Sequence, residues 1–124
     1  MAWKDAIELI LISNHVGTDL NTPRSTYRII LDEPPYQCRT YGYIGQGFRV
    51  KIGLTTEVEI PLDMLENCYL QATNNRNIYN NAIFGSQYER QKINHPCHVH
   101  VVGKIFQVAG VAETIDNNNY LIVV

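Results

Sequence analysis

The chain has 124 residues, of which 45% are hydrophobic and 18% are charged, and its net charge is −2. This length and composition predict one globular domain with its own core and exclude a disordered chain. The acidic balance argues against a protein that coats nucleic acid, because such proteins are usually basic. No apolar run approaches the roughly 18 residues of a transmembrane helix, so we expect no membrane partner.

The first predicted element is a helix over residues 2–13. The apolar residues that recur at helical spacing, and so predict its buried face, are Trp3, Ile7, Ile10 and Leu11. Asp5 and Glu8 interrupt the apolar run that a secretory signal needs, and no basic segment precedes them. We therefore expect a cytoplasmic protein. In that setting an odd count of three cysteines argues against a disulfide framework.

Four strand candidates follow a loop over residues 14–23. They cover residues 27–31, 37–44, 48–52 and 55–60. Glycine-containing turns at residues 45–47 and at Gly53 separate the last three candidates, and turns of this composition are typical of β-hairpins. The segments therefore predict an antiparallel meander with one face on the core and one face in water.

Charged residues alternate with apolar ones along the last two strand candidates. Arg49 and Lys51 share one face of their strand, and Glu57 and Glu59 share one face of the next. Opposite charges that face each other across an antiparallel pair attract, at modest energy when water screens them. We therefore expect these residues to pair across the solvated face of the sheet.

Two features predict self-association. Four of the eight tyrosines precede residue 50, and tyrosine suits interfaces because its ring is apolar while its hydroxyl can hydrogen-bond. The C-terminal run Leu121–Val124 is an apolar strand, which is an association hazard when exposed. We expect a homo-oligomer, with a dimer favoured, and the tyrosine-rich sheet or the C-terminal strand at the interface.

The second half of the chain is expected to be helical up to a closing hairpin. The predicted helices cover residues 62–73, 82–90 and 96–109, and the predicted hairpin covers residues 111–124. Pro61 and Pro96 mark helix starts, Gly110 marks a helix end, and the asparagine-rich segment 74–81 is expected to be a loop. The fold class is thus α+β: a single domain, residues 1–124, in which the meander packs against the N-terminal helix and two to three later helices and the hairpin closes the fold.

The histidines of the last helix diverge. On a helical wheel of about 100° per residue, His98 falls on the apolar face, whereas His100, Lys104 and Gln107 share the opposite face. Metal ligands must converge on one ion, so this divergence argues against a metal site even though His95 and Cys97 lie nearby. We expect no metal and no cofactor.

Cys97 is the one candidate nucleophile, because a helix N-terminus favours a thiolate. His95 or His98 is near enough in sequence to assist it, but no third orienting group is identifiable. The sequence also contains no pair of carboxylates at a spacing typical of acid–base catalysis and no glycine-rich phosphate-binding loop after a strand. We therefore expect no catalytic residue and keep an enzyme built on Cys97 and nearby histidines as the third alternative.

Two segments carry a family resemblance. Trp3–Ile7 followed by Ile10-Leu11 resembles the first helix of small winged-helix domains associated with restriction and mobile-element proteins. Val102–Gly110 followed by Val111-Ala112 and the hairpin resembles the last helix and wing of those domains. That resemblance implies a helix that enters the major groove and a hairpin that touches the DNA backbone. In size and lack of familiar motifs, the whole chain resembles orphan proteins encoded by mobile integron gene cassettes.

The first hypothesis for function is a non-catalytic binding or interaction module that acts as a homo-oligomer. The alternative is a winged-helix-like nucleic-acid-binding protein, because residues 73–112 carry four basic residues against Glu89 alone, a net charge of +3. The residues expected to contact a small molecule or nucleic acid are Arg76, Tyr79, Arg90, Lys92, His100, Lys104 and Gln107.

Overall fold

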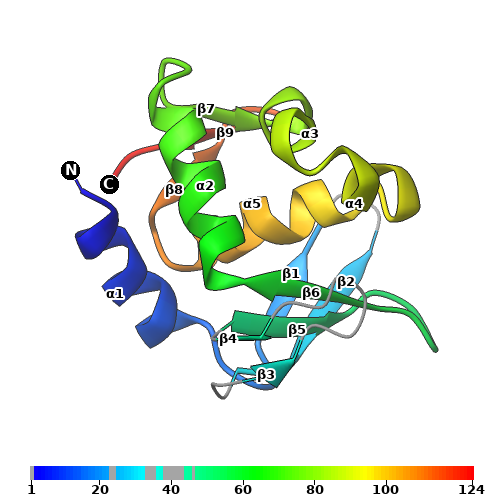
Figure 1. The fold of residues 1–124 in the computed structure, drawn as a ribbon. Coiled ribbons are helices and arrows are strands. Elements are labelled where there is room, and N and C mark those ends of the chain that lie inside the picture. The colour runs from blue at the N-terminus through cyan, green and yellow to red at the C-terminus, as the bar shows by residue number, and fades with distance from the viewer. Residues whose placement is uncertain (1, 23–24, 33–35, 38–43, 46) are drawn as a thin grey trace.

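The structure, a computed structural model, describes residues 2–22, 25–32, 36–37, 44–45 and 47–124. Figure 1 shows a four-stranded sheet towards one end of the molecule and a three-stranded sheet towards the other, with helix α5 (His98–Val108) between them. This arrangement confirms the predicted α+β class with antiparallel strands. Among the described residues, no helix combines the length and the apolar character needed to cross a bilayer.

Helix α1 spans Trp3–Ser13 and confirms the first predicted element. Its fully buried side chains are those of Ala6 and Ile10. Leu11, which the sequence pattern assigns to the buried face, is 45% exposed. The reason is geometric, because a residue next to Ile10 in sequence is turned by about 100° around the helix axis.

The main sheet has four strands, which are antiparallel throughout. In order across the sheet they are β1 (Asp19–Asn21), β2 (Thr26–Leu31), β5 (Gly47–Lys51) and β6 (Glu57–Pro61). Strand β1 lies in the segment predicted to be a loop, where Leu20 pairs with Tyr27 and is fully buried. A three-residue strand with one buried side chain is too short to produce an alternating pattern, so the sequence did not reveal it.

Strands β3 (Tyr36–Gln37) and β4 (Ile44–Gly45) pair with each other and form a separate two-stranded ribbon. The sequence instead predicts one strand over residues 37–44, of which residues 38–43 lie outside the described part of the chain. The predicted hairpin turn at residues 45–47 is wrong: within the described residues β4 pairs with β3, whereas β5 pairs with β2 and β6. The predicted turn at Gly53 is confirmed, because it joins β5 to β6.

The charge pairing predicted across β5 and β6 is confirmed at Arg49. Its guanidinium lies 3.3 Å from the carboxylate of Glu59 and 3.8 Å from that of Glu57. The expectation that this face is solvated is wrong at this point, because Glu59 is only 3% exposed. A buried carboxylate is costly unless it is paired, so the contact with Arg49 is part of what permits Glu59 to lie there.

The second half of the chain contains four helices and three short strands among its described residues. They are α2 (Leu62–Thr73), β7 (Ile78–Asn80), α3 (Asn81–Gln87), α4 (Glu89–Asn94), α5, β8 (Ala112–Thr114) and β9 (Asn119–Ile122). Helix α2 has the predicted bounds, with Pro61 as its N-cap residue. The segment 74–81, predicted to be a loop throughout, contains β7. Helix α5 begins two residues later than predicted, because residues 96–97 form a turn.

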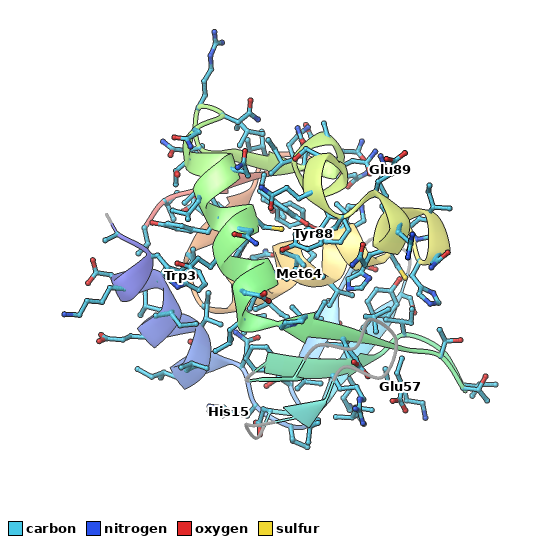
Figure 2. The ribbon with its side chains drawn as sticks, in the orientation of Figure 1. Trp3, His15, Glu57, Met64, Tyr88 and Glu89 are labelled. Atoms are coloured by element: carbon cyan, nitrogen blue, oxygen red, sulfur yellow. The ribbon has the colours of Figure 1, made fainter. Side chains whose placement is uncertain are left out.

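The helix predicted over residues 82–90 is divided at Tyr88. The backbone of Tyr88 has φ −124° and ψ 46°, which is not helical, so α3 ends before it and α4 begins after it. The Tyr88 side chain points back towards α2 (Figure 2), where its hydroxyl accepts a hydrogen bond of 2.9 Å from Asn67 Nδ2. This contact joins α2 to the junction between α3 and α4.

The predicted C-terminal hairpin is confirmed as β8 and β9, but it does not extend the main sheet. It forms a second sheet with β7, in the order β7-β9-β8, so the apolar strand β9 is paired on both edges. Tyr120 and Ile122 are buried, as are Tyr27 and Tyr69. Val123, which follows Ile122 in the C-terminal run predicted at a subunit interface, is 44% exposed. Self-association through this run or through the tyrosine-rich sheet stays a prediction, and Tyr41 and Tyr43 lie outside the described residues.

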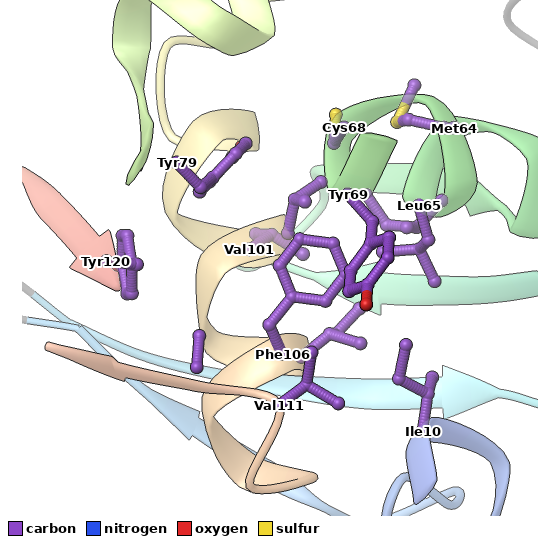
Figure 3. Close-up of a cluster of buried hydrophobic side chains, with 14 of the residues drawn as sticks. Ile10, Met64, Leu65, Cys68, Tyr69, Tyr79, Val101, Phe106, Val111 and Tyr120 are labelled. Carbon is purple, nitrogen blue, oxygen red and sulfur yellow. The ribbon is translucent and has the colours of Figure 1, made fainter. Parts of the chain in front are cut away.

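Helix α5 lies at the centre of the core, as Figure 3 shows. It contacts β1, α1 and α4 as well as β7 and β8 of the small sheet. Val101 and Phe106 are fully buried, and the ring of Phe106 meets that of Tyr79 edge-on at 5.7 Å. A helix enclosed in this way has only a narrow exposed strip, which limits what its outer face can contact.

Candidate functional site

An open pocket of about 820 Å³ lies where α5 begins. Three parts of the fold border it: the ends of β1 and β2, the junction of β7 and α3, and the turn between β8 and β9. Five of its lining residues are asparagines: Asn80, Asn81, Asn117, Asn118 and Asn119. We call this hollow the asparagine pocket.

Two of these asparagines hold the pocket wall together. Asn80 ends β7 and caps α3, because its Oδ1 accepts a hydrogen bond of 3.1 Å from the backbone N–H of Ile83. Its Nδ2 donates to Asn119 Oδ1 at 3.0 Å, across 39 residues of sequence. This link follows from the strand register, which sets Asn80 opposite Asn119 in the β7–β9 pair.

The turn between β8 and β9 is fixed by Asp116. Its carboxylate accepts hydrogen bonds from the backbone N–H groups of Asn118 and Asn119, at 2.7 and 2.9 Å, and from the Asn119 side chain at 3.1 Å. These hydrogen bonds favour the ionised form and hold the pKa of Asp116 below its usual value. The carboxylate is thus committed to shaping the turn.

The other three asparagines present unused hydrogen-bonding groups. Asn81, Asn117 and Asn118 are exposed, and their side-chain amides make no hydrogen bond with any described residue. Each amide offers two donors and one acceptor with two lone pairs. The pocket therefore combines a fixed frame with amide groups that remain open to a ligand.

Cys97 lines the pocket, and its side chain is half-buried. Burial raises the pKa of its thiol, and this effect outweighs the opposing hydrogen bond from the Tyr27 hydroxyl. The thiolate expected from its position near a helix N-terminus is therefore disfavoured at neutral pH. His100, another lining residue, makes a 2.8 Å hydrogen bond through Nδ1 with the hydroxyl of Tyr120.

His98 lies in the core, as the helical wheel predicts. It is fully buried, its Nε2 lies 3.1 Å from the Glu59 carbonyl oxygen, and its ring stacks near Phe84 at 5.3 Å. Burial lowers the pKa of His98 to about 4, so the imidazole is neutral at pH 7. Among the described residues, no group of three or more His, Cys, Asp or Glu side chains is placed to hold a metal ion.

The predicted surface triplet on α5 is brought together, but it is only half-exposed. Lys104 Nζ donates a hydrogen bond of 2.8 Å to Gln107 Oε1 and lies 5.6 Å from the centre of the Tyr120 ring. Burial lowers the pKa of Lys104. His100 and Lys104 thus both contact Tyr120 of β9, so the small sheet covers part of the face expected to be free.

The remaining predicted site residues are dispersed. Arg76 lies in the exposed turn between α2 and β7, away from Arg90 and Lys92 on α4 (Figure 1). Tyr79 is fully buried, and its hydroxyl donates to the Val99 carbonyl oxygen at 2.7 Å. Tyr79 is therefore a core residue, and the three cations form no common surface with it.

The sequence alone did not identify the asparagine pocket. The sequence contains two asparagine-rich segments, 74–81 and 117–119, but no local pattern indicates that they lie side by side in the fold. The pairing of β7 with β9 brings them together, and the ends of β1 and β2 add Thr22 and Tyr27. No family model, curated protein or solved structure matches this chain, so the functional argument rests on the geometry.

Proposed function

We propose that this protein is a non-catalytic binding module whose ligand occupies the asparagine pocket. The observation that carries the proposal is the convergence of five asparagines from two distant segments on one hollow of about 820 Å³. A concave site of several hundred Å³ with a few convergent polar groups is the usual form of a small-molecule site. Asn81 and Asn118 contribute open amides to it, whereas Asn80 and Asn119 maintain its shape.

The chemistry of the pocket supports binding over catalysis. The Cys97 thiol has a raised pKa, and His98 points into the core towards the Glu59 carbonyl. No carboxylate belongs to the described lining, so no stabilising anion lies beside Cys97 there, and the imidazole of the lining residue His100 is engaged with the Tyr120 hydroxyl.

The test uses Cys97 as a reporter of occupancy. The protein is exposed to iodoacetamide at pH 8 with a panel of saccharides, nucleosides and short amides, and alkylation of Cys97 is followed by peptide mass spectrometry. A bound compound slows alkylation of Cys97, and Asn118→Ala weakens that protection while Asn94→Ala, on the exposed end of α4, does not. If no compound protects Cys97 or shifts amide resonances of pocket residues in NMR spectra, the proposal fails.

Nucleic-acid binding is the second candidate, and the connectivity of the second half favours it. Helix α2, strand β7, helices α3 to α5 and the hairpin β8–β9 follow one another, with β9 pairing back to β7. A helical core whose last helix precedes a hairpin is the arrangement expected of a winged helix-turn-helix. The asparagine pocket then lies at the start of the last helix, beside the turn of the wing.

A fluorescence-anisotropy titration with duplex DNA at low and moderate salt tests this candidate. Binding should weaken as salt increases, because phosphate contacts release counterions, and should be lost in Lys104→Ala/Arg90→Ala. Arg28→Ala, on the main sheet, is the control variant. Absence of binding at low salt would exclude the candidate.

We also propose that the protein self-associates, with exposed apolar side chains of α1 and of the loop after it at the contact. In the C-terminal run expected at the interface Ile122 is buried, whereas α1 exposes Ile12 at 70% and Leu11 at 45%, and the loop after it exposes Val16 at 57%. Apolar side chains gathered on one exposed element favour contact with a second copy of the chain.

A further inference from the structure

We infer that the ligand of the asparagine pocket is a small neutral saccharide; this inference rests on the proposed function. The first argument is charge. Within the described residues, the lining consists of amide, hydroxyl, imidazole and thiol groups with small apolar residues between them, and it contains no Lys, Arg, Asp or Glu. Among these described lining residues, a phosphate or carboxylate on the ligand would meet no lysine or arginine, and an ammonium group would meet no carboxylate.

Two charged side chains of a neighbouring hollow already have hydrogen-bond partners. Lys104 and Asp116 line a neighbouring hollow of about 220 Å³, which shares Asn117 with the asparagine pocket. Lys104 donates to Gln107, and Asp116 accepts several hydrogen bonds from its own turn. Because both charged groups already have hydrogen-bond partners, they favour a neutral ligand in the asparagine pocket over a charged one.

The second argument is the match of hydrogen-bonding groups. Asn81, Asn117 and Asn118 come from two segments and offer both donors and acceptors at the rim. A sugar hydroxyl likewise donates one hydrogen bond and accepts two, so neighbouring hydroxyls can satisfy an amide on both of its ends. The pocket is therefore suited to a ligand that carries several adjacent hydroxyl groups.

The third argument separates saccharides from nucleobases, which asparagine also binds through paired hydrogen bonds. Sites that bind bases commonly stack each base on an open aromatic face. The only aromatic rings among the described lining residues are Tyr27, which is 8% exposed, and the imidazole of His100, which is engaged with Tyr120. Ala82 and Pro96 offer small apolar patches instead, which suit the C–H groups of a sugar ring.

The experiment compares glucose, maltose and N-acetylglucosamine with adenosine and with glucose 6-phosphate, using protection of Cys97 and NMR shifts on the intact protein. We expect a neutral saccharide to bind, glucose 6-phosphate to bind at least tenfold more weakly than glucose, and adenosine not to bind. Asn81→Ala and Asn118→Ala should each weaken saccharide binding about three- to tenfold, as loss of one or two hydrogen bonds predicts. Asn94→Ala should leave it unchanged.

The outcomes separate this inference from the function on which it rests. If adenosine or a short amide protects Cys97 and no saccharide does, the saccharide inference is overturned while the binding function stands. If glucose 6-phosphate binds more tightly than glucose, the argument from charge is wrong. If no compound of any class occupies the pocket, both proposals fail.

Discussion

Gly103 is the residue on which the close contact between α5 and the small sheet depends. Glycine inside a helix normally costs about 1 kcal/mol relative to alanine, so its presence there needs a reason. The Tyr120 ring supplies that reason, because a Cβ at Gly103 would lie within 3.0 Å of three of its ring carbons. The absence of a side chain at Gly103 thus allows Tyr120 to reach His100 and Lys104.

We expect Gly103→Ala to destabilise the fold by about 1–3 kcal/mol, the usual cost of overpacking a core. Urea denaturation at pH 7 measures this change in the free energy of unfolding. Gly53→Ala is the matched control, because a Cβ there would meet Thr56 at an ordinary 3.6 Å. A Gly103→Ala protein as stable as the wild type would show that Tyr120 moves aside at no cost.

His98 makes the stability of the fold depend on pH. Its pKa is about 4 in the folded protein, below the usual 6.5, so between these values the unfolded chain binds a proton that the folded chain does not. The contribution of His98 is fully present above pH 6.5 and is lost as the pH falls towards 4. Over that range we expect a loss of roughly 3 kcal/mol.

Urea denaturation at pH 7.5, 6.0 and 5.0 measures this slope. In His98→Gln the difference between pH 7.5 and pH 5.0 should shrink, whatever the stability of the variant at pH 7.5. His15→Gln, at an exposed position after α1, serves as the control and should keep the wild-type slope. An unchanged slope in His98→Gln would rule out His98 as the group responsible.

At the scale of elements, the start of α3 depends on the Asn80 side chain. Asn80 caps the helix and also donates to Asn119, so it joins α3, β7 and β9. Replacing an N-cap asparagine with alanine costs about 0.5–2 kcal/mol, and we expect Asn80→Ala to fall in that range.

Thermal and urea denaturation of Asn80→Ala and Asn81→Ala test this assignment side by side. Asn81 is the neighbouring exposed asparagine without a side-chain hydrogen bond to any described residue, so Asn81→Ala should leave stability within about 0.5 kcal/mol of the wild type. Equal losses in both variants would mean that the cap contributes little. The two variants also distinguish the residues that shape the pocket from those that bind the ligand. Asn81→Ala should weaken binding without changing stability, whereas Asn80→Ala should lower stability.

At the scale of the whole molecule, the exposed apolar side of α1 is the surface that we propose for self-association. If two copies associate there, sedimentation velocity at micromolar concentration should give twice the chain mass of 14.2 kDa. Ile12→Lys should return the protein to a monomer. The control is Leu54→Lys, because Leu54 is 94% exposed in the turn between β5 and β6, and this variant should still associate. A wild-type monomer at micromolar concentration would contradict self-association.

Elements with local signals could be predicted from the amino-acid sequence. The bounds of α2, the stop of α5 near Gly110, the hairpin after it and the buried position of His98 all follow from helical periodicity and from turn residues, which act within a few positions. The fold class follows from the same signals, because alternating strands beside amphipathic helices must share one core.

Which segments meet could be seen only in the folded chain. Strands β1 and β7 have three residues each, too few for a pattern, and they exist because a partner strand pairs with them. The pairing of β7 with β9 turns two asparagine-rich segments into one pocket, and the burial of Tyr79 and Glu59 depends on what packs over them. Such contacts join residues far apart in sequence, so no local pattern encodes them, and the candidate site is a product of the fold.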